Sequence, residues 1–426
     1  MSIGTAKQNP TGAPGGRLWT RNFSLVCVTA LVYSLGFQFL LPILPMYMKS
    51  FGGTDSDVGL IFGTYSVAGL TSRMVAGWGI DRFGRKSLLV IAAFINFVGM
   101  PLYIIAASVP GLAFLRLFHG LAIGILTTVV PVLVADLVPP ARRGEGLGYY
   151  GLAQSVSSAI GPGIAIWLIA AKGFPLAGFT LLFAACTIIG ALTLLLALFV
   201  HETRSPQHTL AAWPKFRWSM VFNRSALPLM TTLCFVTFAQ GSVMSFAALY
   251  LATDNPANVS IYFMVSAITM LISRPVVGSI SDRVNRRYVI IPLIACCAIG
   301  VSIFAISPSL PAAIAAGIVW GTGFGSLNAT LLALAVDMVK PTERGAALAT
   351  VQSALDIGMG IGSMGLAYVA QIAGYHVMFG VASLSCVLGL SYFLYYMRTS
   401  RRPAIIVAEN ASAVDAHEVS TSTAES

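Results

Sequence analysis

Four charged residues and one histidine lie well inside long apolar segments of this 426-residue chain. They are Arg73, Arg116, His119, Arg274 and Asp356. If these segments cross a bilayer, each unpaired charge costs at least about 2.5 kcal/mol, so the residues are functional candidates. Asp356 is interpreted either as a carboxyl group that binds and releases a proton or as a partner in a structural hydrogen bond. Arg73 and Arg274 either extend to the headgroups or pair between helices.

His119 follows Arg116 by three residues, so both side chains share one face of a helix. An imidazole can titrate near neutral pH, which makes His119 a candidate for proton binding. A histidine that only packs and hydrogen-bonds inside the bundle is the alternative interpretation. The candidates for proton coupling are therefore Asp356, Arg116 and His119.

A set of charged residues occurs twice, at a constant distance of 201 positions. The recurring pairs are Arg73 with Arg274, Asp81 with Asp282, Arg85 with Arg286, and Asp136 with Asp337. Chance does not keep one offset across blocks this far apart, so the sequence indicates an internal duplication. In membrane proteins a duplicated bundle places a binding site between its halves, and rocking of the halves moves a solute.

The composition predicts that transmembrane helices position these residues. Only 9% of the residues are charged and 57% are hydrophobic, whereas a soluble domain is about a quarter charged. The apolar stretches lack the alternation of barrel strands, and each is near the roughly 20 residues that cross a bilayer as a helix. The predicted spans are 22–48, 58–78, 87–107, 111–134, 147–170, 179–200, 226–251, 261–280, 288–307, 310–336, 346–370 and 375–396. We predict an all-α integral membrane protein with twelve transmembrane helices in two pseudo-symmetric six-helix bundles.

The placement of basic residues predicts the orientation. Of the 25 Lys and Arg residues, those outside the spans fall on the side of both termini, with Lys49 and Lys172 as exceptions. Because cytoplasmic loops are enriched in Lys and Arg, we expect both termini in the cytoplasm and a multi-pass protein of a bacterial cytoplasmic (inner) membrane. The net charge of +10 then reflects topology, so nucleic-acid binding is not expected.

The expected organisation has five parts. They are a cytoplasmic N-terminal tail (1–21), a six-helix bundle (22–200), a cytoplasmic central loop (201–225), a second six-helix bundle (226–397) and a disordered cytoplasmic tail (398–426). The six cysteines lie within spans without metal-ligand spacing, so we expect neither a disulfide framework nor a metal site. No cluster of nucleophile and base is found, so we expect no enzyme activity and no cofactor.

The loop between the second and third spans carries Gly77, Asp81, Arg82 and the run Gly84-Arg85-Lys86. This pattern resembles the loop motif of the major facilitator superfamily, and Gly278–Arg287 resembles the degenerate copy in its second half. The run Arg116–Gly120 is similar to a motif of the drug:proton antiporter branch, with His119 where that branch usually has Gln. Gly161-Pro162-Gly163 matches a further antiporter motif in part, without its trailing glycine pair.

The resemblance implies a conformational latch at the cytoplasmic ends of the helices. Its residues would be Gly77, Asp81, Arg82, Gly84, Arg85 and Asp136, with the mirror set Asp282, Arg286 and Asp337. Gly77 would let the eleventh helix approach, and the carboxylate would meet the N-terminus of that helix, where the dipole favours an anion. Such a network would hold the ends together in one state and break in the other. Ordinary loop charge that orients the helices is the alternative. The family also implies a role for Arg116 in coupling or in contacts with the backbone of the first helix.

Polar and aromatic residues within the spans are candidates for the substrate cavity. They are Tyr33, Phe37, Gln38, Arg116, Phe238, Gln240 and Asn328. Phenylalanines with a few amides suit an apolar pocket with polar anchors, although such groups also join helices. The first span has no acidic residue, which argues against a strongly cationic substrate.

These features predict a secondary active transporter, most simply a proton-coupled exporter of small amphipathic molecules. The alternatives are a proton-coupled importer of a sugar, organic acid or other metabolite, and a membrane sensor that transports nothing. The expected partners are a small-molecule substrate, protons and the lipid bilayer, and we expect a monomer.

Overall fold

The computed structural model describes residues 18–139, 142–170, 176–203, 223–339 and 343–399. The helices in the described part are α1 (Arg21–Ser50), α2 (Asp55–Phe83), α3 (Arg85–Leu102), α4 (Val109–Leu137), α5 (Arg143–Ala170), α6 (Leu176–Phe199), the short η4 (Arg224–Ala226), α7 (Leu227–Ala252), α8 (Pro256–Arg283), α9 (Arg286–Phe304), α10 (Leu310–Asp337) and α11 (Arg344–Thr399). Most of both predicted tails and of the central loop lies outside the described residues.

The long helix α11 contains the last two predicted spans. Gly374 interrupts it with backbone angles φ 80° and ψ 171°, which a glycine adopts without steric cost. Ten helices of the described chain are long and apolar enough to cross a membrane, and α11 is counted once among them. The helix α2, with its serines, glycines and charges, is not among the ten. These two differences reconcile ten candidates with the twelve predicted spans.

Polar side chains define where several helices begin. Thr54 and Asp57 form a reciprocal capping box at the start of α2, so two backbone N–H groups at that end are satisfied. Ser108 accepts from the backbone of Gly111 at the start of α4, and Asn255 caps α8 in the same way. These caps fix where the three helices begin.

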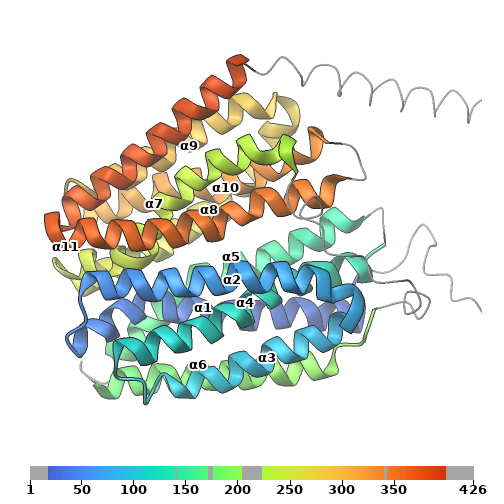
Figure 1. Cartoon of the computed structure of the whole chain (residues 1–426), viewed down its shortest axis with the longest axis horizontal. Coiled ribbons are helices and arrows are strands. Elements are labelled where there is room, and N and C mark those ends of the chain that lie inside the picture. Colours follow the sequence, from blue (N-terminus) through green and yellow to red (C-terminus); the bar gives the residue numbers. More distant parts are fainter. Residues whose placement is uncertain (1–17, 140–141, 171–175, 204–222, 340–342, 400–426) are drawn as a thin grey trace, which may run out of the picture.

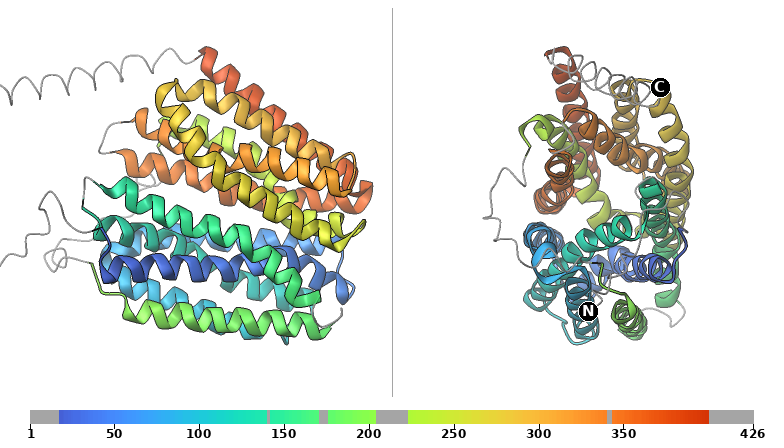
Figure 2. Two further views of the ribbon diagram at one scale, coloured as in Figure 1. Left: turned by 180° about the vertical axis from the view of Figure 1, so that it is seen from behind. Right: turned by 90° about the vertical axis from the view of Figure 1, so that its right-hand side faces the viewer.

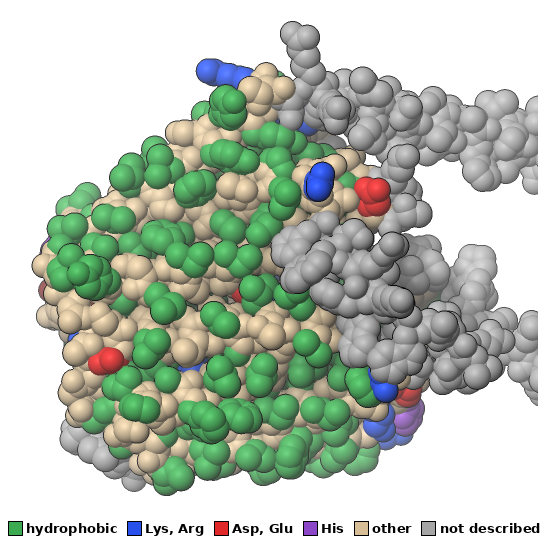
Figure 3. All heavy atoms as spheres, in the orientation of Figure 1, with side chains coloured by type: hydrophobic (Ala, Val, Ile, Leu, Met, Phe, Trp, Pro, Cys, Tyr) green, Lys and Arg blue, Asp and Glu red, His purple; other side chains and the backbone are tan. Residues whose placement is uncertain are grey.

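The helices form two groups that lie side by side along the length of the molecule (Figures 1 and 2). One group contains α1–α6 and the other α7–α11. The groups meet chiefly where α2 packs on α11, α5 on α8 and α1 on α7. Hydrophobic side chains are spread over the lateral face in Figure 3, as expected for a surface in contact with lipid.

Both ends of the described chain lie at the same end of the bundle (Figure 1). This end, which carries Leu18 and Thr399, is called the termini end, and the other is called the opposite end. Because consecutive helices run in alternate directions, α2 reaches the termini end at Phe83 and α4 reaches it at Leu137.

Candidate functional site

An ion pair joins the two groups of helices inside the bundle. Arg73 of α2 lies with its Nε 3.0 Å from Oδ2 of Asp356 in α11, and its Nη2 lies 3.4 Å from Oδ1. The Asp356 side chain is 9% exposed and that of Arg73 is 24% exposed. The sequence left two interpretations of Arg73, extension to the headgroups or pairing between helices, and in the structure Arg73 pairs between helices. The same contact places the Asp356 carboxylate beside the Arg73 guanidinium group.

Arg274, the repeat equivalent of Arg73, crosses the other contact between the groups. From α8 its Nη1 donates to the hydroxyl of Ser155 in α5 at 2.6 Å and lies 3.4 Å from the carbonyl oxygen of Gly151. Its Nε donates to the carbonyl oxygen of Gly325 in α10 at 3.1 Å. Both arginines thus reach from one group of helices to the other, but their partners differ.

Arg116 lies in an aromatic cluster within the first group. Its side chain is fully buried, with the guanidinium carbon 4.2 Å from the ring centre of Tyr65 and 5.1 Å from that of Phe62. Such contacts stabilise a cation by about 2 kcal/mol or more when desolvated. No acidic partner is found for it among the described residues, and its Nε and Nη2 atoms have no hydrogen-bond acceptor there.

His119 belongs to the same cluster, one turn further along α4. Its Nδ1 lies 3.5 Å from Nη1 of Arg116 and 3.4 Å from the hydroxyl of Tyr103. Its Nε2 is buried without a partner in the described structure. The two candidates that the sequence predicted to share a helix face are thus neighbours. Among the described residues, no hydrogen bond joins either of them to the Arg73–Asp356 pair.

The predicted latch residues of the first repeat gather at the termini end of one helix group. Nε of Arg85 lies 3.1 Å from Oδ2 of Asp136, and the same oxygen accepts from the Thr203 hydroxyl at 3.0 Å. Gly84 has a φ of 83°, which turns the chain sharply between α2 and α3. The ring of Phe83 lies 5.0 Å from the guanidinium carbon of Arg82.

Glu202, which sequence reasoning missed, completes this cluster. Its carboxylate accepts from the backbone N–H groups of Arg85 and Lys86, each at 3.0 Å, at the start of α3. The positive end of the helix dipole favours an anion there. A Cβ on Gly84 would lie 2.5 Å from Glu202, so glycine at this position also makes room for the carboxylate.

The second repeat has the corresponding ion pair between Arg286 of α9 and Asp337 of α10. The side chains of Asp81 and Asp282 lie outside what the structure describes. Both observed pairs therefore connect helices within one group. The proposed contact of this network with α11 stays a prediction.

The predicted cavity residues are divided between two places. Tyr33 lies with its hydroxyl 3.2 Å from that of Tyr150, and Gln38 donates to Ser158, so both bind α5 within the first group. Phe37 stacks on Tyr65 at 5.6 Å. Asn328 in α10 is partly buried, with no partner found for its Oδ1 in the described chain, and Gln240 in α7 is also partly buried.

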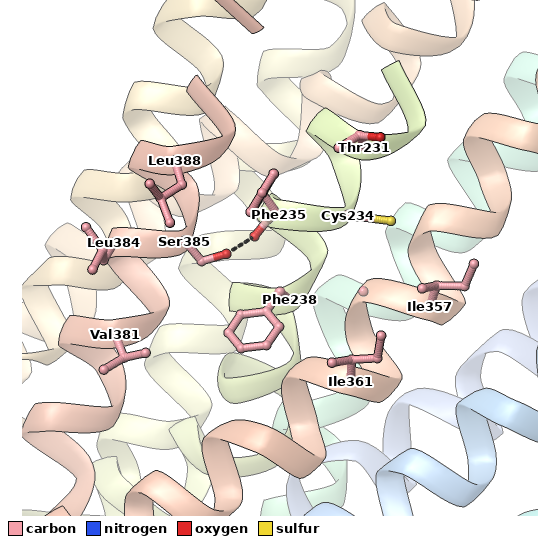
Figure 4. Close-up of a pocket in the computed structure, with 11 residues that line it drawn as sticks. Thr231, Cys234, Phe235, Phe238, Ile357, Ile361, Val381, Leu384, Ser385 and Leu388 are labelled. Carbon is pink, nitrogen blue, oxygen red and sulfur yellow. Dashed lines mark hydrogen bonds between the residues drawn. The ribbon is translucent and has the colours of Figure 1, made fainter. Parts of the chain in front are cut away.

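Phe238 lines a separate apolar cavity of about 410 Å³ between α7 and both segments of α11 (Figure 4). Phe235, Cys234 and Ile361 share its wall, and the Ser385 hydroxyl donates to the carbonyl oxygen of Phe235 at 2.7 Å. The structure therefore does not bring Phe238 together with the residues of α1.

The family model of the major facilitator superfamily matches residues 26–255 and 229–418. The chain belongs to this superfamily. Its all-helical fold in two related bundles is the fold of major facilitator transporters, so the protein is a multi-pass membrane transporter and not an enzyme.

Relatives cover nearly the whole carrier. An uncharacterised transporter of this superfamily from Methanocaldococcus jannaschii is 22% identical over 390 residues, which is 89% of this chain and 99% of the relative. Multidrug resistance protein MdtG of Proteus mirabilis is 26% identical over 415 residues, 91% of this chain and 99% of the relative. Among solved structures, the nucleoside transporter NupG has a TM-score of 0.71 at 14% identity and covers 88% of this chain and 99% of NupG.

The two groups of helices are in close contact at the opposite end. There Gly59 and Gly63 of α2 lie against α11, where an added Cβ would come within 2.3 Å of Ala367 and 2.4 Å of Met364. The Tyr375 hydroxyl also donates to Asp55 at 3.0 Å across the two groups. At the termini end, a Cβ on Gly77 would meet no atom within 4 Å. The helices α2 and α11 are therefore in close contact at the opposite end, and Arg73 and Asp356 join them further along.

No group of three or more His, Cys, Asp and Glu side chains within the described ranges could hold a metal ion.

Proposed function

We propose that this carrier exports small amphipathic molecules in exchange for protons, by alternating access across a bacterial cytoplasmic membrane. In this proposal the halves 22–200 and 226–397 rock about a central site, both termini lie in the cytoplasm, and the chain acts as a monomer. The observation that supports it most directly is the Arg73–Asp356 ion pair, which connects α2 to α11 across the two halves.

Asp356 is suited to couple the proton to this motion because a protonated carboxyl group no longer attracts a guanidinium group by its charge. With Asp356 ionised, the pair holds α2 against α11 and keeps the empty carrier closed at the opposite end. Substrate binding weakens the pair and lets the carrier turn outward, where a proton neutralises Asp356. The protonated carrier returns and releases its proton to the cytoplasm, so export and proton entry are linked.

The latch residues complete this cycle at the termini end. When the carrier faces outward, Gly77 and Asp81 would meet α11 and the charge network would hold the cytoplasmic ends together. In the present arrangement this contact is absent at Gly77, as expected for the inward-facing state. Arg116 and His119 are proposed to support coupling from their buried cluster.

The relatives favour export over the other candidate functions. MdtG carries a multidrug resistance name, and the Staphylococcus aureus protein that matches over 130 residues at 26% identity is named quinolone resistance protein NorA. These drug-resistance names support the proposed direction of transport, which is export. Likeness to the D-xylose-proton symporter, at 16% identity, concerns the fold alone.

Flux measurements in proteoliposomes test this function. We expect the purified wild-type chain to concentrate amphipathic fluorescent dyes against their gradient when a pH gradient is imposed. Asp356→Asn should abolish this accumulation but leave downhill exchange, because the variant has no proton to bind. Asp356→Glu should retain part of it, and Arg142→Gln, which removes an exposed charge just before α5, should behave as wild type.

Two results would contradict the proposal. Accumulation that persists after the pH gradient is collapsed would exclude proton coupling, and accumulation of dye in the direction of proton flow would indicate import.

A further inference from the structure

The internal repeat relates the partners of the two arginines as well as the arginines themselves. Arg73 and Arg274 are 201 positions apart, and so are Ser155 and Asp356. Each arginine therefore reaches across the halves to the same place on the facing helix. At that place α11 presents a carboxylate to Arg73, and α5 presents a hydroxyl to Arg274.

The hydrogen bonds of Arg274 leave its charge uncompensated by any described residue. Nε and Nη1 bind neutral oxygens of Gly325 and Ser155, and Nη2 has only the Met270 sulfur, at 3.5 Å. A thioether is a weak acceptor. The Ser155 hydroxyl donates its own proton to the Gly151 carbonyl at 2.9 Å, so it serves Arg274 as a neutral acceptor. A guanidinium group whose Nη2 has only this weak acceptor can bind a carboxylate through that nitrogen more strongly than it binds sulfur.

The charge balance of the interior also indicates that a negatively charged group is missing. Arg73, Arg116 and Arg274 lie inside the described spans, and Asp356 is the one acid placed with them. Arg116 is surrounded by aromatic rings and reaches no acid there, so a negative charge is what this interior lacks. An unpaired arginine in a span is costly, and a ligand that supplies the opposite charge reduces that cost.

We propose that Arg274, at the contact between α5 and α8, binds the carboxylate of the transported molecule, which supplies to Arg274 the negative charge that Asp356 supplies to Arg73. The substrates are then amphipathic organic anions, with the apolar part of the molecule between the halves. This assignment rests on the proposed transport of amphipathic molecules and names their charge. It does not depend on the direction of transport or on proton coupling.

Binding to the purified full-length protein in lipid nanodiscs tests the proposal with matched probes. The probes are naphthalene-1-acetate and benzoate, each compared by isothermal titration calorimetry with its uncharged amide of nearly the same shape. We expect wild type to bind each acid at least about tenfold more tightly than its amide. Arg274→Gln should remove this preference, and Arg274→Lys should retain part of it, because an ammonium group keeps the charge but not the fork geometry.

Ser155→Asp is the second variant, since it keeps Arg274 and gives it an internal carboxylate like that of Asp356. It should remove the preference for the acids while leaving binding of the amides within about twofold of wild type. Arg142→Gln is the matched control for loss of a positive charge away from this contact and should keep the full preference.

A wild-type protein without preference for the acids, or without binding to any of the four probes, would overturn the assignment. So would a preference that survives in Arg274→Gln or in Ser155→Asp. These results are separate from those of the flux experiment. Loss of proton coupling with an intact acid preference would overturn the proposed mechanism and leave the anion site in place.

Discussion

The α2–α11 and α5–α8 contacts between the halves have the same architecture but different chemistry. At the α2–α11 contact, Arg73 meets the carboxylate of Asp356, and glycines bring the helix backbones together. At the α5–α8 contact, Arg274 meets a hydroxyl and two backbone carbonyls. Met264 stands in α8 at the repeat position of Gly63. The duplication gave both contacts the same arrangement of helices. A few substitutions then made the α2–α11 contact neutral and left the α5–α8 contact with a net positive charge.

The largest expected effect comes from comparing the coupling energies of the two pairs. A double-mutant cycle with Arg73→Gln and Asp356→Asn should give a coupling of about 2–3 kcal/mol, since breaking a mostly buried pair leaves a charge alone. The corresponding cycle with Arg274→Gln and Ser155→Ala should give about 1 kcal/mol, as for one hydrogen bond. Thermal or denaturant unfolding in detergent would measure both. Equal couplings would contradict the difference between the contacts.

An intermediate effect is expected from glycines at the two ends of α2. Gly59→Ala places a methyl group against Ala367 and should destabilise the closed opposite end by about 1–3 kcal/mol, as overpacking does. Gly77→Ala meets open space in this state and should instead disfavour the outward-facing state, where the latch is proposed to form. Distances between labels on the two halves, measured by single-molecule fluorescence, should therefore shift in opposite directions.

Gly99→Ala is the control for this pair, because a Cβ there also meets nothing within 4 Å and the residue lies in α3, away from α11. It should leave the distribution unchanged. A shift of the same sign for Gly59→Ala and Gly77→Ala would rule out an alternating contact along α2.

The smallest expected effect distinguishes the two ion pairs at the termini end. Asp136 is 29% exposed and also accepts from Thr203, whereas Asp337 is 47% exposed. Asp136→Asn should destabilise the protein by about 1 kcal/mol, and Asp337→Asn by less than about 0.5 kcal/mol, because solvent screens the more exposed pair. Thermal unfolding at low and high salt checks both values, and a larger loss for Asp337→Asn would reverse the predicted order.

The sequence was sufficient for the fold because apolar length and an internal repeat determine it. The span predicted at 310–336 corresponds to α10 at Leu310–Asp337, and the last two spans meet at Gly374 within α11. The sequence also identified Arg73 and Asp356 as unusual. The sequence could not predict that they form an ion pair, because 283 positions separate them. An arginine near a membrane surface can also place its charge by extending to the headgroups, without any partner on another helix.

Other features of the site needed the three-dimensional arrangement. Glu202 follows α6 in an ordinary polar stretch, and only folding brings it to the N-terminus of α3. The equivalence of Ser155 and Asp356 was available from the offset of the repeat, but serine carries no charge that would draw attention to it. The roles assigned to the latch and cavity residues remain predictions for the experiments above.

The three interior arginines and their single acid have an electrical consequence. With Asp356 ionised, these four groups sum to a charge of +2 inside the described spans. Moving one elementary charge through a membrane potential of 100 mV is worth about 2.3 kcal/mol. On the outward step a bound monoanion lowers this sum to +1. On the proposed return step Asp356 is protonated, so the same groups sum to +3. Any part of the field that these groups cross as the halves rock therefore makes the membrane potential act unequally on the loaded and unloaded steps of the same cycle.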